Sequence, residues 1–241
     1  MDGFFVEDFT GGAFVMFGTP HLVVLAILFL ACLGVTLWRK RFSEEQRLWF
    51  RYGLGTLLLV NEIAWHLWNI AVGRWTVQTM LPLHLCSLLV FTSAYMLFTR
   101  NEWIYEFSYF MGIGATIQAI LTPDLGIYGF PHFRFFQTFI SHGGMFLAAI
   151  YMTAVEGLRP TWRSLVRVII TLNLYMIPVT ILNFLIGSNY LYTAHKPETP
   201  SLLDVLGPWP LYILSVELVG LAVCLLLYLP WAIHDWRVKK A

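Results

Sequence analysis

Seven apolar segments, each long enough to cross a lipid bilayer, follow one another along the chain with short connections between them. They cover residues 21–38, 52–72, 80–98, 103–122, 135–155, 165–187 and 209–232. At about 1.5 Å of rise per residue, helices of this length span a hydrocarbon core about 30 Å thick. Hydrophobic residues make up 58% of the chain and charged residues 12%, a balance that excludes a water-soluble enzyme. The sequence therefore predicts an all-α, polytopic membrane bundle with seven transmembrane helices and a single domain over residues 1–241.

The basic residues predict how this bundle is oriented. All but three of the fifteen Lys and Arg residues fall in connections on one side of the predicted membrane, and the exceptions are Arg74, Arg134 and Lys196. Because basic residues are retained in the cytoplasm, this bias predicts an N-terminus outside and a cytoplasmic C-terminus. No basic residue precedes the first apolar segment, so we expect no cleaved signal peptide.

Polar and ionisable side chains gather near the predicted outer ends of six of the seven segments. Inside a membrane such groups are costly unless paired, so they indicate a functional site or an interhelical contact. The set comprises Glu62, His66, Asn69, His84, Cys86, Gln118, Gln137, His142, Asn183 and Glu217. Since contacts between helices can form at any depth, their shared depth favours a cavity in the outer half of the bundle.

The second apolar segment carries three of these residues on one helix face. Glu62, His66 and Asn69 are spaced at i, i+4 and i+7, which places them in a row on an α-helix. A carboxylate one turn from a histidine can orient the imidazole and raise its basicity for acid–base catalysis. The alternative is a buried Glu–His pair that only joins two helices.

Cys86 differs from the other two cysteines in its surroundings. Cys32 and Cys224 lie among apolar residues and are expected to be inert, whereas Cys86 lies in the polar layer four residues after Pro82. A thiolate nucleophile needs a base or a positive group nearby, and His66 or His142 is the candidate. The alternative is a structural cysteine beside a proline kink.

Further residues of the layer have supporting roles in this interpretation. Asn69, Gln137 and Asn183 are candidate donors to an oxyanion, and His84, Gln118, Tyr190 and Glu217 are candidate contacts to a substrate. Three histidines with Glu62 make a possible zinc set, but no H-E-x-x-H spacing is present, so we expect no metal and no other cofactor. The expected partners are a phospholipid or another acyl lipid and the bilayer, without nucleic acid; the sequence does not indicate an oligomeric state.

Several short motifs resemble those of the bacterial YwaF-like integral membrane proteins. They are Leu81–Leu88, Phe133–Gly143, Asn189-Tyr190, Lys196-Pro197, Pro200-Ser201-Leu202-Leu203-Asp204 and Gly207-Pro208-Trp209-Pro210. The YwaF-like proteins are grouped with a vertebrate transmembrane acyltransferase family that remodels ether phospholipids through a membrane-embedded cysteine. The resemblance implies a multi-pass protein of a bacterial plasma membrane, with Cys86 at the position of that cysteine.

Together these observations predict a membrane-embedded lipid acyltransferase. Its catalytic residues would be Cys86, with His142 or His66 as general base and Glu62 orienting His66. Three alternatives stay open: a small-solute transporter or ligand sensor, an intramembrane lipid ester hydrolase similar in architecture to the androgen-induced-gene family, and a structural partner of a membrane complex.

Overall fold

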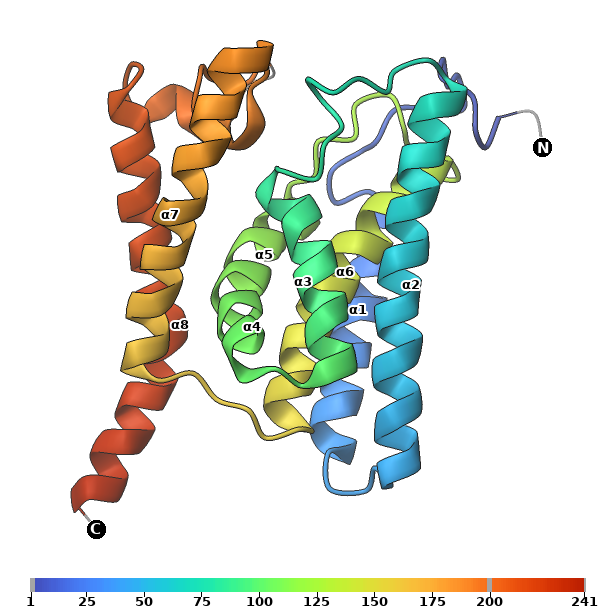
Figure 1. Cartoon of the computed structure of the whole chain (residues 1–241). Helices are drawn as coiled ribbons and strands as arrows, with labels where there is room; N and C mark the ends of the chain where they lie inside the picture. Colours follow the sequence, from blue (N-terminus) through green and yellow to red (C-terminus); the bar gives the residue numbers. More distant parts are fainter. Residues whose placement is uncertain (1–2, 199–200, 241) are drawn as a thin grey trace. The chain divides into compact units, whose positions relative to one another are not determined.

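The computed structural model describes residues 3–198 and 201–240, and these residues form helices and turns without a strand (Figure 1). The bounds of the long elements are α1 (Thr19–Trp38), α2 (Glu44–Ala71), α3 (Leu85–Thr99), α4 (Glu102–Phe107), a π-helical turn (Ser108–Gly112), α5 (Ile113–Leu121), α6 (Phe133–Ala154), α7 (Trp162–Ile186) and α8 (Leu211–Lys240). Because α4, the π-helical turn and α5 are continuous, the described residues contain seven long helical segments at the seven predicted positions. The prediction of an all-α fold is confirmed.

Three of these helices are long and apolar enough to cross a membrane. They are α1, α7 and α8, and α3 is a shorter apolar helix of 15 residues. Helices α2 and α6 have 28 and 22 residues, but their polar side chains lower their hydropathy. The membrane character of the chain is thus supported by three helices, while seven crossings and an outside N-terminus remain predictions.

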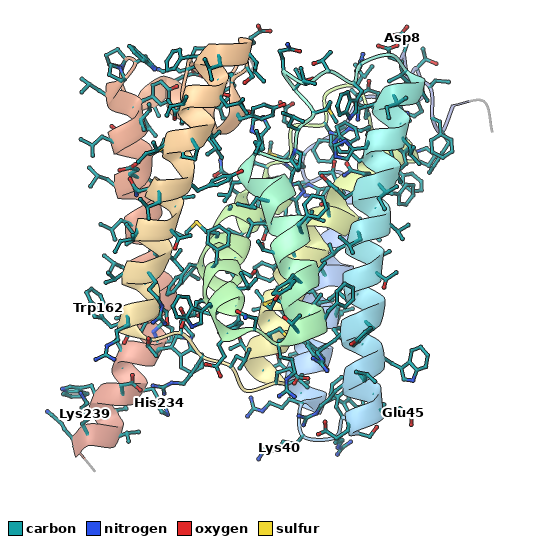
Figure 2. All side chains as sticks on the ribbon, in the orientation of Figure 1. Asp8, Lys40, Glu45, Trp162, His234 and Lys239 are labelled. Carbon is teal, nitrogen blue, oxygen red and sulfur yellow. The ribbon has the colours of Figure 1, made fainter. Side chains whose placement is uncertain are left out.

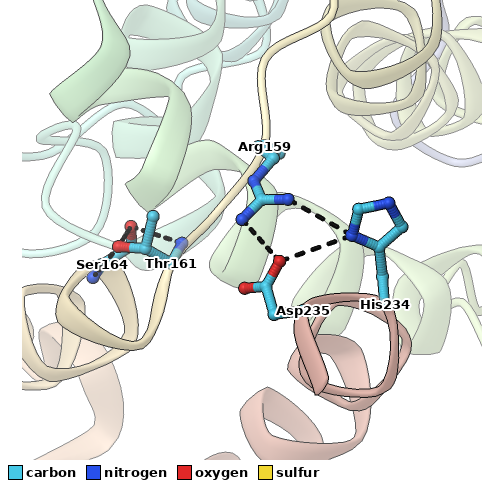
Figure 3. A network of polar contacts seen from close by, with 5 residues as sticks. All are labelled: Arg159, Thr161, Ser164, His234 and Asp235. Atoms are coloured by element: carbon cyan, nitrogen blue, oxygen red, sulfur yellow. Dashed lines mark hydrogen bonds and ion pairs between the residues drawn. The ribbon is translucent and has the colours of Figure 1, made fainter. Parts of the chain in front are cut away.

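Side-chain caps explain where several helices begin. Ser43 and Gln46 form a reciprocal capping box at the start of α2, and Thr161 and Ser164 form another at the start of α7 (Figure 3). Each box satisfies two N–H groups that a helix start otherwise leaves unpaired. At the other end of α7, Gly187 adopts the left-handed conformation that commonly terminates a helix.

The chain forms two compact units, and the first comprises residues 1–75 and 89–158. In this unit α6 packs against α1, α2 and α5, and one side of α6 is buried along most of its length. Gly144 permits the close approach of α2, because a Cβ atom at this position would lie 2.9 Å from Cδ2 of Leu58. The core of this unit is therefore centred on α6.

The N-terminal segment is held across one end of this first unit by hydrogen bonds to its main-chain carbonyls. The carbonyl of Phe4 accepts from Phe133 N, the carbonyl of Phe5 from Trp68 Nε1, and the carbonyl of Val6 from His132 Nε2. We call residues 3–17 the N-terminal strap. Figure 2 shows Asp8 of the strap at the opposite end of the unit from Lys40 and Glu45.

The second unit comprises residues 76–88 and 159–241, of which the described part contains α7, α8 and the connection between them. Two short 3₁₀-helices, Tyr190–Tyr192 and Leu202–Val205, shape that connection. Near the start of α7, Arg159 Nη2 donates to Asp235 Oδ1 of α8 at 2.7 Å, and His234 lies beside this pair (Figure 3). An ion pair therefore joins the two helices at this end.

Candidate functional site

The segment that precedes Cys86 is not helical, although the apolar pattern predicts a helix from residue 80. Helix α3 begins at Leu85, and residues 76–84 form turns around Pro82. The hydroxyl of Tyr190 accepts from Leu81 N and donates to the Val77 carbonyl, both at 2.8 Å. The hydroxyl of Tyr175 donates to the Leu83 carbonyl at 3.1 Å. Tyrosine hydroxyls thus replace the main-chain bonds that a helix would supply, as non-helical backbone in an apolar setting requires.

Cys86 is consequently the second residue of α3, whereas the predicted segment 80–98 would place it well inside a helix. The main-chain hydrogen bond from Leu88 N to the His84 carbonyl, 3.0 Å long, spans the position of Cys86. The first turn of a helix has free N–H groups and the positive end of the helix dipole, which favour an anion. The thiol is half-buried, whereas Cys224 is buried inside α8. Of these two cysteines, Cys86 has the surroundings that favour a thiolate.

His84 lies just before α3 and belongs to the same unit as Cys86. Its ring packs edge-on against Tyr190, with 5.1 Å between centroids, and against Tyr192 at 5.4 Å. Because His84 precedes the helix, the regular i to i+2 separation that directs two side chains apart does not apply to His84 and Cys86. His84 and Tyr190, which the sequence predicts to contact a substrate, therefore lie next to each other.

His142 is held in one tautomer within α6. Its Nδ1–H donates to the Thr138 carbonyl at 2.9 Å, a bond that fixes the proton on Nδ1. The lone pair then resides on Nε2, and the side chain is only half-buried. This is the state that a general base requires.

His66 is arranged differently, on α2. Trp75 Nε1–H donates to its Nδ1 at 3.0 Å, so the ring proton resides on Nε2, which lies 3.7 Å from Oε1 of Glu62. The predicted contact between Glu62 and His66 is present, at a distance longer than a hydrogen bond. Since the tryptophan occupies the imidazole lone pair, His66 is less suited than His142 to accept a proton.

The predicted amide donors are largely committed to the protein itself. Asn183 donates to the Tyr190 carbonyl and to Thr193 Oγ1, and its oxygen accepts from Ser188 Oγ and Tyr190 N. All four bonds are between 2.7 and 2.9 Å long. Asn183 therefore stabilises the connection between α7 and α8. Asn69 donates to the Trp65 carbonyl one turn earlier at 2.8 Å. These contacts account for both asparagines structurally.

Gln137 belongs to a polar contact between α2 and α6 that includes Arg134, which in the sequence indicates only the topology. Asn61 Nδ2 donates to the Gln137 carbonyl at 3.0 Å, and Arg134 donates to the Gln137 side chain. The Arg134 guanidinium also lies 3.8 Å from the ring centroid of Trp65, and its charge interacts with that of Glu62. The signal for Arg134 is a cation directly before the predicted segment 135–155, where a charge beside apolar surroundings needs partners.

The structure groups the predicted residues by unit. Unit 1 contains Glu62, His66, Asn69, Gln118, Gln137 and His142, and unit 2 contains His84, Cys86, Asn183, Tyr190 and Glu217. Gln118 is exposed near the end of α5 and Glu217 is half-buried on α8. Within residues 3–198 and 201–240, no three His, Cys, Asp or Glu side chains form a group that could hold a metal ion.

The family model of the TMEM164 family matches residues 16–228, which is most of the chain. No curated protein and no solved structure matches it.

Proposed function

We propose, from the premise that the chain belongs to the TMEM164 family, that it is a membrane enzyme that transfers acyl groups between lipids through a thioester on Cys86. The likeness of its motifs to the YwaF-like proteins, and of Cys86 to the cysteine of the ether-phospholipid acyltransferases, supports this proposal. The proposed setting is the plasma membrane of a bacterium, with a phospholipid as acyl donor.

The observation that carries the proposal is the position of Cys86 in the first turn of α3, after a non-helical segment held by tyrosines. A helix N-terminus favours the thiolate, which is the nucleophilic form. The two other cysteines lie inside α1 and α8, where no helix start is nearby. This difference supports Cys86 as the proposed nucleophile among the three thiols.

The reaction would proceed in two balanced steps. The Cys86 thiolate attacks the ester carbonyl of the donor, the S–C bond forms, the C–O ester bond breaks, and a histidine gives its proton to the departing alcohol of the lysolipid. In the second step the neutral histidine takes the proton of an acceptor hydroxyl, whose oxygen attacks the thioester and releases the thiolate. We assign the histidine to His142, because its Nε2 lone pair is available.

The experiment is acyl transfer in vesicles that contain the purified protein and a phospholipid with a labelled acyl chain. Mass spectrometry should find the label on an acceptor lipid and, transiently, on the peptide that contains Cys86. Cys86→Ser should abolish both signals because a hydroxyl is a far weaker nucleophile without a strong base. Cys32→Ser and Cys224→Ser are the matched controls and should keep activity.

Three outcomes would contradict parts of the proposal. Full activity of Cys86→Ser, or labelling of Cys32 or Cys224 in its place, would reject covalent catalysis at Cys86. Release of the label only as free fatty acid would identify a hydrolase. Binding or movement of a solute without any change in the lipids would favour the transporter alternative.

A further inference from the structure

An arginine cluster lies in unit 1 at the end where α1 ends and α2 begins. It consists of Arg47 and Arg51 in the first turns of α2, Arg100 between α3 and α4, and the carboxylate of Glu156, which follows α6. Figure 2 marks this end of the unit by Lys40 and Glu45. Two of the three guanidinium groups, those of Arg51 and Arg100, pair with this one carboxylate, so the cluster has an excess of positive charge.

Glu156 is deeply buried between two of these arginines. Only 1% of its side chain is exposed, Arg100 Nε lies 2.9 Å from Oε2, and Arg51 Nε lies 3.7 Å from Oε1. Arg100 adopts a left-handed backbone conformation with φ of 58°, which is uncommon for a residue with a side chain. The pairing of Glu156 thus holds a backbone conformation that local preference disfavours.

The arginines retain donors that this carboxylate does not satisfy. The Nε atoms of Arg47 and Arg51 are both buried and have no hydrogen-bond partner among the residues that the structure describes, and the Glu156 oxygen that lies 3.7 Å from Arg51 Nε has none either. The closest acidic oxygen to Arg47 that the structure gives as an ion pair belongs to Glu44, at 3.9 Å, and the Glu44 side chain is 88% exposed. Buried donors without acceptors are costly, so a ligand with several acceptor oxygens fits this environment.

The cluster is open on one side. The side chains of Arg47 and Arg100 are 25% and 49% exposed, while that of Arg51 is 10% exposed. An anion can therefore contact the first two arginines from outside the protein. A shallow cavity of about 230 Å³ lined by Trp38, Arg41, Phe42 and Gln46 lies at the same end, in the connection between α1 and α2. Phe42 joins it to the cluster, because its ring packs 5.9 Å from that of Tyr151, whose hydroxyl donates to the Arg47 carbonyl.

We propose that Arg47, Arg51 and Arg100 form a binding site for a phosphate group, supplied by the headgroup of an anionic phospholipid. Phosphate presents several oxygens to the planar guanidinium donors, which bind it better than a lysine ammonium does. Exposed aromatic and basic side chains at this end, among them Trp38 and Trp49, suit the headgroup region of a bilayer. This site does not depend on the proposed acyl transfer, because it contains none of its catalytic residues.

The test measures binding of phosphatidylglycerol to the purified protein in mild detergent, by native mass spectrometry and by the shift in thermal unfolding temperature. We expect Arg47→Gln to weaken this binding by about tenfold or more, since a charge-assisted hydrogen bond is lost. Arg47→Lys keeps the charge but lacks the Nε donor and should recover only part of the affinity. Helicity measured by circular dichroism establishes that each variant is folded.

Arg39→Gln is the matched control, because it removes the same charge from an exposed position at the same end of the unit. It should leave phosphatidylglycerol binding within about twofold of the unchanged protein, as expected for a surface charge. Equal losses in Arg39→Gln and Arg47→Gln would overturn the proposal in favour of diffuse attraction to a basic surface. Displacement of phosphatidylglycerol by inorganic phosphate would support a phosphate site whose ligand is free phosphate. Retention of phosphatidylglycerol in excess phosphate would support the lipid headgroup as the ligand.

Discussion

The hydroxyl of Tyr190 accepts a hydrogen bond of 2.8 Å from the main-chain N–H of Leu81, although 109 residues separate the two in the sequence. This bond fixes the segment that leads into Cys86. Tyr190 therefore has a role that its position in a long connection does not reveal: it holds the start of the helix that carries the proposed nucleophile.

Tyr190→Phe should reduce alkylation of Cys86 and acyl transfer together. The change leaves Leu81 N and the Val77 carbonyl without the hydroxyl, at a cost of about 1–3 kcal/mol in the free energy of unfolding. The measurement is the rate of iodoacetamide labelling at Cys86 beside thermal unfolding. Tyr228→Phe is the control, because the contact of the Tyr228 ring with Trp162 does not need the hydroxyl. Unchanged labelling in Tyr190→Phe would show that the segment keeps its shape without this bond.

The two histidines of unit 1 should respond differently to the same substitution. His142→Gln removes the available Nε2 lone pair and should lower the rate of acyl transfer by about 10²–10⁴-fold, the usual contribution of a general base. His66→Gln should have a much smaller effect, because the lone pair of His66 already accepts from Trp75. The measurement is the initial rate of acyl transfer in vesicles for each of the two variants. A greater loss in His66→Gln would move the proton transfer to α2.

Hydropathy and breakers suffice to predict where the helices lie. Each predicted apolar segment coincides with a helix of the structure, because a membrane helix needs a continuous apolar run and ends where Gly, Pro or polar residues interrupt it. Helices α2 and α8 extend eight residues beyond their apolar segments, to Glu44 and Lys240, and the pattern places the start of α3 five residues early. The residues that make a turn possible there, Tyr175 and Tyr190, are distant in sequence, so no local signal indicates them.

The sequence predicts the chemistry of the candidate site less completely than it predicts the fold. The spacing of Glu62 and His66 correctly predicts a pair on one helix face, since such spacing is a property of the helix alone. The partner of the other His66 nitrogen is Trp75, which lies beyond the end of α2. Likewise Arg100 and Glu156 are both polar residues in connections, and only the packing of α2, α3 and α6 buries their contact.

Labelling from outside the cell tests the orientation predicted by the basic residues. Asp8 and Lys40 lie at opposite ends of unit 1 (Figure 2). In a variant without the native cysteines, a membrane-impermeant maleimide should label Asp8→Cys in intact cells and should label Lys40→Cys only after lysis. Efficient labelling of Lys40→Cys in intact cells would invert the predicted topology and place the arginine cluster on the outer side.

Acidification should loosen the N-terminal strap through His132, which caps α6. The ring is fully buried, its Nε2 donates to the Val6 carbonyl at 2.9 Å, and its Nδ1 accepts from Arg134 N at 3.1 Å. Only the neutral ring can make both bonds. Burial is the main cause that lowers the pKa of His132 below its ordinary value of 6.5, and the nearby charge of Arg134 acts in the same direction.

The unfolded chain therefore binds a proton at His132 before the folded protein does. The stability that depends on the neutral ring is complete above pH of about 6.5 and decreases as the pH falls from there towards the lower pKa of the folded state. Limited proteolysis of the strap should consequently be faster at pH 5.5 than at pH 7.5. His132→Gln removes a helix cap at a cost of about 0.5–2 kcal/mol in the free energy of unfolding, so the strap of this variant should be cleaved faster at both pH values. Because glutamine does not titrate, the difference in cleavage rate between the two pH values should be smaller. If the variant keeps the whole pH dependence, the titrating group is not His132.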